Sequence, residues 1–371
     1  MIKLISILGL ICLLILSGCV GQKEDNIVKI GITLPLTGAL SSYGAEIKKG
    51  LDLAVEEINI DKSGKKVKLI YEDACYPKDA TPAISKLVET DNIDFIGGNF
   101  CVIAIPPISA VTESKKITVM QISTVSDMIL SSGDYIFSPN IASAYSAKEQ
   151  AKFAKKYWVA NTVGIVYYNT DMGKSYGLNF AKEFETLGGK VLLTEETALE
   201  QYDFKDVISK IIAKNPDVLQ LIHMGPNLGN MLNQLKEMGV NKPIITYEEA
   251  DNPDLFKTAG ENALGMVIAI PGMQSSDNLI AFEKNYYIKY NENPAVLSRV
   301  AYDAIYLEFA AYENCGFDKD CIKNYLLNVK DYAGASGVFS IQSDGTAKKE
   351  IIFKKVIGGS GTLEAINYSV E

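Results

Sequence analysis

Beyond its first 26 residues, the chain alternates apolar runs with amphipathic stretches. Val28–Leu34 and Val67–Glu72 are the first two runs rich in apolar residues, and runs of this length are typical of buried strands. Between them, Ile47, Leu51 and Val55 recur at the spacing of one face of a helix. A strand, a helix and a second strand in this order predict a βαβ unit, whose two strands are parallel.

The same alternation continues along the chain, and a second series begins near residue 163. It predicts further strands at Phe95–Gly97, Ile117–Gln121, Val163–Tyr168, Val191–Leu193, Val218–Ile222 and Ile244–Tyr247. Helices are expected from Ala80 to Val88 and at Tyr176–Leu187, Phe204–Lys214 and Leu228–Met238. The remaining segment is less regular, with expected helices at Asn278–Tyr290, Ala301–Cys315 and Cys321–Asn328 and strands at Val338–Ile341 and Ile351–Val356.

Two series of βαβ units predict an α/β fold of two doubly wound lobes, each with a mostly parallel sheet between layers of helices. The last segment has too few strands for a third sheet, so we expect it to complete the first two lobes across a hinge that the chain crosses more than once. We assign residues 27–141 and 272–345 to lobe 1, and residues 142–271 and 346–371 to lobe 2. The cleft between the lobes is the default ligand site.

The N-terminal residues have the pattern of an export signal. Residues 4–17 form an uncharged apolar stretch after Lys3, which is shorter than the roughly 20 residues of a membrane span. The stretch ends in Leu16-Ser17-Gly18-Cys19, which resembles a lipobox. We expect a signal peptide at 1–18, a lipid on Cys19 and a tether at 19–26, which make the protein extracytoplasmic and anchored to the cell membrane. An uncleaved anchor is the alternative, and it also leaves the bulk of the chain outside.

Composition places the chain among globular proteins and narrows its partners. Apolar residues make up 47% of the chain and charged residues 22%, which suits well-packed cores. The formal net charge is −9, with acidic residues dispersed along the chain rather than gathered in a tail. This charge disfavours nucleic acid and an anionic membrane face as partners of the folded surface, because both are negatively charged.

Six cysteines are present, of which Cys12 falls in the expected signal peptide and Cys19 carries the expected lipid. An oxidising compartment allows the other four to pair. The simplest pairing is local, Cys75 with Cys101 and Cys315 with Cys321. A zinc site is the alternative, but neither pair has CxxC spacing and the only histidine, His223, stands apart. We therefore expect no metal.

Several short motifs then occur in a specific order. They are Pro35-Leu36-Thr37-Gly38 with Tyr43-Gly44, Tyr71-Glu72-Asp73-Ala74-Cys75, Gly97-Gly98-Asn99-Phe100-Cys101, Ala259-Gly260-Glu261 with Gly265, Ala301-Tyr302-Asp303-Ala304, and Gly334, Gly337 and Asp344-Gly345. Their order, from Val28 to Val356, resembles the leucine/isoleucine/valine-binding proteins, which are type I periplasmic binding proteins of ABC transporters. The resemblance implies that fold, a Cys75–Cys101 disulfide, an amino acid as ligand, permease subunits as partners and no cofactor.

In that family the ligand's carboxylate meets backbone N–H groups and hydroxyls at helix starts of the first lobe. Unsatisfied donors and the positive dipole end favour an anion there. By position, the loops are Gly98–Ile103 and Ser123–Ser126, with the hydroxyls of Ser123, Thr124 and Ser126. The same hydroxyls also suit the capping of a helix, and the two roles are compatible. Val102 departs from the family, which usually has a serine there, so one hydrogen bond worth roughly 1.5–3 kcal/mol is missing.

The ligand's ammonium needs an anion, and the resemblance points to Glu248. This residue precedes Leu255 by the family's spacing and follows a strand of the second lobe, at the end where α/β sheets place ligand groups. Glu249 takes the role if the register slips by one. The alternative is that both glutamates lie in a surface loop and have no ligand role.

The cleft walls depart from the family in the second lobe. Met172 and Met224 stand where relatives often carry tyrosines, and methionine shapes itself to apolar groups. Ordinary core packing is the alternative for both. Tyr43 and Tyr302 match cleft aromatics of the family, so we expect them to cover the ligand from lobe 1, with structural packing as the alternative.

These features favour a solute-binding receptor that captures an aliphatic or branched-chain amino acid and delivers it to an ABC permease. The alternative is a ligand-sensing receptor domain for amides or other small apolar solutes, a role that rests on analogy. We do not expect an enzyme. One histidine beside Met224 offers no Ser-His-Asp arrangement, and Pro35-Leu36-Thr37-Gly38 stands where a dinucleotide-binding GxGxxG would follow the first strand.

Overall fold

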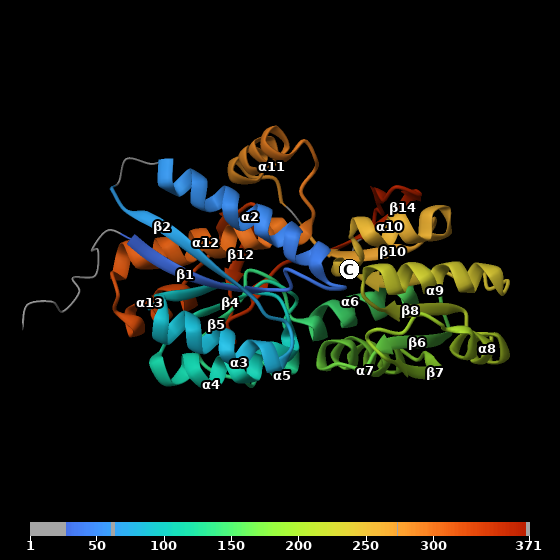
Figure 1. Ribbon diagram of the computed structural model, residues 1–371. Helices are drawn as coiled ribbons and strands as arrows, with labels where there is room; N and C mark the ends of the chain where they lie inside the picture. The colour runs from blue at the N-terminus through green and yellow to red at the C-terminus, as the bar shows by residue number, and fades with distance from the viewer. Residues whose placement is uncertain (1–26, 61–63, 273, 369–371) are drawn as a thin grey trace, which may run out of the picture.

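A computed structural model describes residues 27–60, 64–272 and 274–368 of the chain. The expected signal peptide, the lipid site Cys19 and the tether lie outside the described residues. None of the helices in the described ranges combines the length and the apolar character that a membrane crossing requires. Figure 1 shows two lobes side by side, with the C-terminal helices α12 and α13 beside the N-terminal strands and α11 beyond α2.

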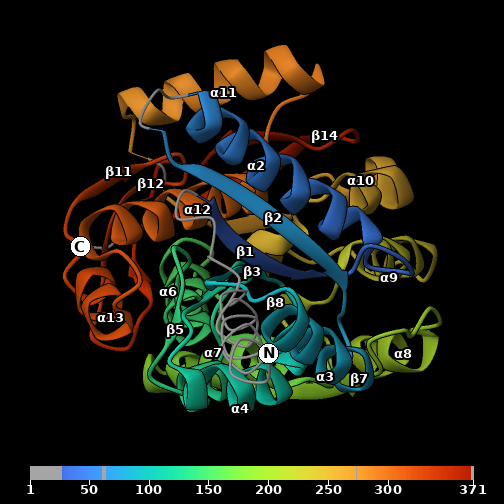
Figure 2. The same cartoon turned by 60° about the vertical axis from the view of Figure 1, so that its left-hand side comes forward.

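Lobe 1 is built on a parallel sheet in the order β2-β1-β3-β4-β5. Its strands are β1 (Ile27–Leu34), β2 (Lys66–Asp73), β3 (Phe95–Asn99), β4 (Val119–Gln121) and β5 (Ile136–Phe137). Its helical segments are α2 (Ser41–Ile60), α3 (Pro77–Ser85), η1 (Lys86–Thr90), η2 (Val102–Ala104), α4 (Ile105–Lys115), α5 (Asp127–Leu130), α11 (Asp277–Tyr290), α12 (Val296–Cys315) and α13 (Lys319–Leu327). Helices α2 and α12 lie on one side of this sheet, and α3 and α4 lie on the other (Figures 1 and 2).

Lobe 2 contains a sheet in the order β15-β14-β10-β9-β8-β6-β7. Its strands are β6 (Thr162–Tyr168), β7 (Lys190–Thr197), β8 (Val218–Ile222), β9 (Ile244–Tyr247), β10 (Val267–Pro271), β14 (Ile351–Gly358) and β15 (Thr362–Ala365). Its helical segments are α6 (Ser143–Lys156), α7 (Asp171–Thr186), α8 (Lys205–Lys214), α9 (Gly225–Glu237), η3 (Glu248–Ala250), α10 (Pro253–Ala259) and η4 (Gly260–Ala263). Strands β6 to β10 are parallel, and their order, β7-β6-β8-β9-β10, repeats the order of lobe 1. At the β10 edge, β14 pairs antiparallel with β10, and β15 pairs antiparallel with β14. The predicted doubly wound α/β fold is confirmed.

Three chain segments connect the lobes, at β5 to α6, β10 to α11 and β13 (Ala347–Lys348) to β14. They are hydrogen-bonded to one another: Ser138 N donates to Gly345 O at 2.9 Å, and Gly272 N donates to Glu350 O at 2.6 Å. The third segment leaves a small antiparallel sheet of β11 (Tyr332–Gly334), β12 (Gly337–Ile341) and β13. The predicted boundary falls between residues 345 and 346, yet β13 lies after this boundary and pairs with β12, which lies before it. The exact lobe boundaries therefore stay a prediction.

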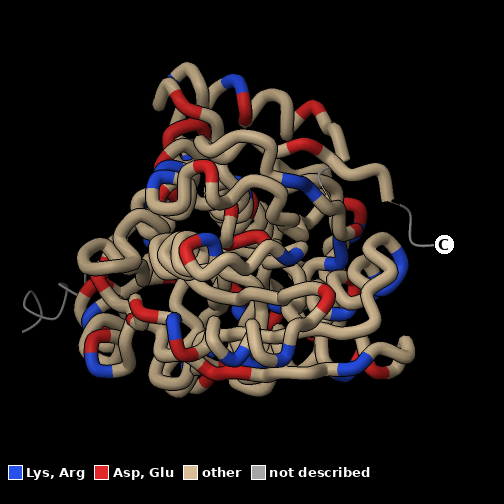
Figure 3. The backbone as a smooth tube through the Cα atoms, turned by 90° about the vertical axis from the view of Figure 1, so that its right-hand side faces the viewer, with Lys and Arg blue, Asp and Glu red and all other residues tan. Residues whose placement is uncertain are grey.

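Both expected disulfides are present. Cys75 and Cys101 are joined with an S–S distance of 1.97 Å, and Cys315 and Cys321 with one of 1.99 Å. The first links the segments that follow β2 and β3, and the second links the end of α12 to α13. Along the face in Figure 3, acidic and basic positions are interspersed, as expected for a solvated surface.

Candidate ligand-binding site

Residues of both lobes line a cavity of about 50 Å³ where the carboxyl ends of the two parallel sheets face each other. Its lining comes from Leu40, Cys75, Phe100, Cys101, Val102, Ile103 and Ser123 of lobe 1 and from Tyr168, Thr170, Met172, Leu199, Met224 and Glu249 of lobe 2. Most of these residues directly follow a strand, and α/β proteins place ligand groups at this end of a sheet. The wall is largely apolar, with a few polar groups that converge on it.

The lobes are closed over this cavity. Tyr76 Oη donates to Glu200 Oε1 at 3.1 Å across the rim, and the backbone N–H of Met128 donates to Asp171 Oδ2 at 3.1 Å. A third bond across the lobes lies deeper, where Thr124 N donates to Glu249 Oε1 at 3.3 Å.

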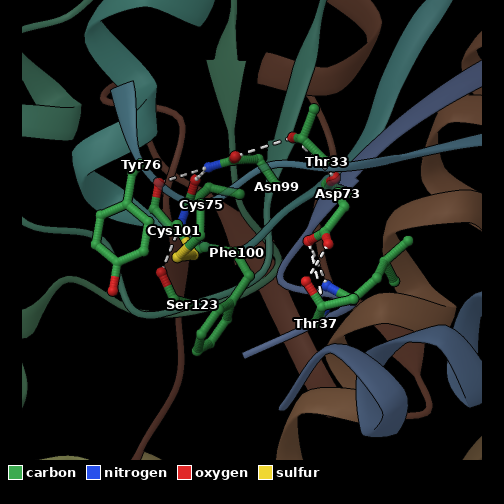
Figure 4. Close-up of a disulfide and its surroundings, with 12 residues drawn as sticks. Thr33, Thr37, Asp73, Cys75, Tyr76, Asn99, Phe100, Cys101 and Ser123 are labelled. Atoms are coloured by element: carbon green, nitrogen blue, oxygen red, sulfur yellow. Dashed lines mark hydrogen bonds between the residues drawn. A yellow bond between two sulfur atoms is a disulfide. The ribbon is translucent and has the colours of Figure 1, made fainter. Parts of the chain in front are cut away.

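The first disulfide and a buried polar chain hold the lobe 1 side of the cavity in place (Figure 4). Thr33 Oγ1 donates to Asn99 Oδ1 at 3.0 Å, and Asn99 Nδ2 donates to Gln121 Oε1 at 2.6 Å. Gln121 Nε2 then donates to Ser123 Oγ at 2.5 Å and to Phe100 O at 2.9 Å. These bonds fix two adjacent loops, one after β3 and one after β4.

The start of η2 offers hydrogen-bond donors to the cavity. Val102 and Ile103 are the first residues of η2, which runs into α4, and both line the cavity. The first N–H groups of a helix have no partner inside it, so they are suited to an anion. Ser123, which is completely buried, adds a hydroxyl beside them. This arrangement is suited to a carboxylate.

Glu249 is the one acidic side chain among the described lining residues, and it is only 2% exposed. Burial, followed by the negative charge of Glu248, raises the pKa of Glu249 to about 8. In the described part of the chain no Lys or Arg forms an ion pair with Glu249. A buried carboxylate without a cation is costly, so this position favours a ligand that brings a positive charge.

Glu248, the residue expected to hold the ammonium, does not line the cavity. Tyr176 Oη donates to its Oε2 at 3.0 Å, and burial raises the pKa of Glu248 to about 7. The charge of Lys349 acts in the opposite direction. Lys349 is itself buried and donates to Ser336 Oγ at 2.7 Å. Glu248 therefore has internal partners that Glu249 lacks.

The other predicted ligand residues divide between the cavity and its surroundings. Val102, Ser123, Met172 and Met224 line it. Thr124 reaches the site only through its backbone, and Ser126 and Tyr43 are buried nearby without lining it. The structure corrects the expectation for Tyr302, whose hydroxyl bonds Glu57 of α2 and whose ring packs on Phe282 of α11.

Four lining residues were absent from the sequence prediction: Leu40, Tyr168, Thr170 and Leu199. Phe100 and Ile103 fall within the predicted loop Gly98–Ile103, although they were not singled out as ligand residues. Tyr168 had a usable signal, because it ends a predicted strand. Leu199 follows the edge strand β7, and no sequence pattern around Leu199 indicates a ligand role.

His223 supports the cavity wall without facing a ligand. Its Nδ1 accepts from Met224 N at 2.9 Å and its Nε2 lies 3.2 Å from Ala198 O. Burial lowers the pKa of His223 to about 4, so the ring is neutral near pH 7. The described residues contain no group of three His, Cys, Asp or Glu side chains arranged to hold a metal ion.

The two α/β lobes are closed over a largely apolar cavity. Its wall contains a buried acidic side chain without an ion-pair partner and the backbone N–H groups at the start of η2. These features are typical of a protein that binds a small solute. A family model described as periplasmic binding protein matches residues 27–360, so the chain belongs to this family. Membership implies an extracytoplasmic location. The predicted resemblance and fold class are confirmed.

Named relatives agree with this assignment. The leucine-, isoleucine-, valine-, threonine- and alanine-binding protein of Pseudomonas aeruginosa is 25% identical over 297 residues, which cover 78% of this chain and 79% of the relative. A leucine-binding protein from Thermotoga maritima superposes with a TM-score of 0.86 at 23% identity, covering 91% of this chain and 97% of its own. A Rhodopseudomonas palustris solute-binding protein in complex with 3,4-dihydroxybenzoic acid reaches a TM-score of 0.84 at 22% identity, covering 93% and 97%.

Proposed function

We propose that this protein captures an amino acid with an aliphatic or branched apolar side chain in the closed cavity and delivers it to the permease of an ABC transporter. The observation that carries the proposal is Glu249, a buried carboxylate without an ion-pair partner in an otherwise apolar wall. A free α-amino group is the positive charge that a small solute most simply brings to it. The proposal includes no catalysis.

The rest of the site is complementary to the remaining parts of an amino acid. The N–H groups of Val102 and Ile103 and the hydroxyl of Ser123 are suited to its carboxylate. Met172, Met224 and Leu199 present a polarizable, apolar surface for its side chain. The P. aeruginosa relative's name gives five amino acids, which supports this class of ligand.

An aromatic acid, such as the one bound by the R. palustris protein, is the other candidate ligand. Its carboxylate could meet the same amides, but it has no cation for Glu249 and would leave that carboxylate unpaired or protonated. An ammonium group would stabilise the ionised form of Glu249, so this position favours an amino acid.

A thermal-shift panel tests the proposal. It compares L-leucine, L-isoleucine and L-valine with L-aspartate and 4-hydroxybenzoate. A ligand at a hundred times its dissociation constant stabilises the folded state by about 2.7 kcal/mol, so binding gives a clear rise in melting temperature. We expect the three apolar amino acids to stabilise the protein. Stabilisation by 4-hydroxybenzoate alone would contradict the proposal.

We also propose that a lipid on Cys19 tethers the binding domain to the membrane, where the permease lies. Cys19→Ser should release the protein from the membrane fraction or block its processing. A normally processed variant that stays in the membrane fraction would exclude lipidation.

A further inference from the structure

Tyr43 occupies an unusual place at the start of α2. Its side chain is completely buried at the junction of the lobes, yet it does not line the cavity. Its hydroxyl accepts a hydrogen bond from Gly225 N at 2.8 Å and donates one to Glu249 O at 3.2 Å. A single lobe 1 side chain thus binds the backbone of lobe 2 twice.

Each of these bonds is adjacent to a cavity residue. Gly225, the donor of the first bond, follows Met224 and is the first residue of α9. The acceptor of the second bond is the backbone carbonyl of Glu249, whose side chain lines the cavity. On the lobe 1 side, the Tyr43 ring stacks on Phe100, with ring centroids 5.3 Å apart and an interplanar angle of 17°. Tyr43 therefore contacts three segments that shape the cavity, and these segments come from both lobes.

The Tyr43 hydroxyl lies close to the backbone of Gly225, and a side chain at position 225 would crowd it. A Cβ atom on Gly225 would lie 3.1 Å from Tyr43 Oη and 3.0 Å from Asn252 Oδ1. Both distances are tighter than ordinary packing, so a larger residue at position 225 would push the hydroxyl away. Burial and the charge of Glu249 raise the pKa of Tyr43 well above its usual value, and the hydroxyl keeps the proton that it donates.

Of the other hydrogen bonds between the lobes described above, the buried Thr124–Glu249 bond is long at 3.3 Å, and the remaining two are less protected from water. The Tyr76–Glu200 bond is exposed to solvent, and Met128 is only partly buried at its bond to Asp171. Hydrogen bonds shielded from water are electrostatically stronger than exposed ones. The two bonds of Tyr43 are thus well placed to stabilise the closed state.

We propose that Tyr43 is a positioning residue that fastens the lobes together in the closed state and fixes Met224 and Glu249 at the cavity. It acts on how long a ligand stays rather than on which ligand is chosen. The inference uses the proposed function only for the choice of probe ligand.

The test compares Tyr43→Phe with Tyr302→Phe. Tyr43→Phe keeps the stacked ring and removes both bonds, whereas Tyr302→Phe removes a hydroxyl that bonds Glu57 within lobe 1. Stopped-flow fluorescence measures L-leucine association and dissociation. We expect Tyr43→Phe to dissociate about 10-fold faster or more, as the loss of two hydrogen bonds implies, with association within about 3-fold of wild type. Tyr302→Phe should match wild type, and the affinity ranking of leucine, isoleucine and valine should be unchanged.

Unchanged dissociation in Tyr43→Phe, or an equal change in Tyr302→Phe, would overturn the inference. If the wild-type protein binds none of these amino acids, the proposed function fails and Tyr43 is judged separately. Hydrogen exchange of the Gly225 amide in the ligand-free protein then decides. Faster exchange in Tyr43→Phe alone supports the fastening role, and equal exchange in all three proteins overturns it.

Discussion

Glu248 and Glu249 are neighbours in the chain, yet their carboxylates have different surroundings. The chain leaves β9 at Tyr247 and turns directly into η3, so successive side chains point in different directions. Glu248 meets Tyr176, whereas Glu249 meets the cavity and the Thr124 amide. Family spacing locates the pair, but only the local turn determines which of the two lines the cavity.

Val102 offers a test of the anion site at a single side chain. It lines the cavity at the start of η2, where the resembling family has a hydroxyl. Val102→Thr keeps the shape and adds a donor, so L-leucine should bind more tightly by roughly 1.5–3 kcal/mol if the hydroxyl reaches the carboxylate. Isothermal titration calorimetry measures the change.

Val111→Thr is the matched control, because Val111 lies on α4 away from the cavity. It should leave the affinity unchanged. Equal affinities for wild type and Val102→Thr would place the ligand's carboxylate elsewhere.

At the scale of elements, apolar pattern was a reliable guide where it was strong. β8 and β9 have the predicted bounds, and the helix expected at Asn278–Tyr290 begins one residue earlier. The helices α4 and α6 and the strand β10 were missed. α4 begins at Ile105 and has Pro106 and Pro107 in its first turn, and α6 buries small alanines that give a weak apolar signal. Neither segment could be recognised without the sheet against which it packs.

The Cys75–Cys101 disulfide joins the loops after two strands of lobe 1 and borders the cavity. Replacing both cysteines with alanine should lower the free energy of unfolding by about 3 kcal/mol in the chain-entropy model and also weaken ligand binding. Denaturant titration and calorimetry measure the two effects.

The Cys315–Cys321 pair is the natural control, because it joins α12 to α13 and lies outside the cavity lining. Its removal should lower stability with little effect on affinity. If both double variants lose affinity equally, the first disulfide has no specific role at the site.

At the scale of the whole molecule, the two series of strands predicted two lobes, and the sequence also assigned residues 346–371 to lobe 2. The antiparallel pairing of β14 with β10 and the strand β15 were not predicted, because such long-range pairing leaves little local signal. The same holds for Tyr302. Its motif was recognised, but the packing of α11 against α12 directs its ring away from the cleft.

The buried glutamates predict a pH dependence of stability. The pKa of Glu248 is raised to about 7 and that of Glu249 to about 8, each mainly by burial. In the unfolded chain both ionise near pH 4.3, so the folded state holds more protons between that pH and about 8. The free energy of unfolding of the ligand-free protein should therefore fall as pH rises from 5 to 8, by about 1.4 kcal/mol per unit of pKa shift.

Urea titrations at several pH values measure this slope. Glu249→Gln cannot ionise at this position and should show a shallower fall over the same range. If wild type and Glu249→Gln have the same slope, Glu249 is already solvated in the ligand-free protein.

The most direct test of the central claim is a calorimetric cycle on Glu249. It compares L-leucine with 4-methylpentanoate, which is leucine without its amino group, in wild type, Glu249→Gln and Glu248→Gln. In wild type, removal of the amino group should weaken binding by roughly 2–5 kcal/mol, the usual cost of leaving one member of a buried charge pair alone. Glu249→Gln should lose a similar amount with leucine and discriminate little between the two ligands, while Glu248→Gln keeps the discrimination. Equal binding of both ligands by wild type, or undiminished discrimination in Glu249→Gln, would contradict the account.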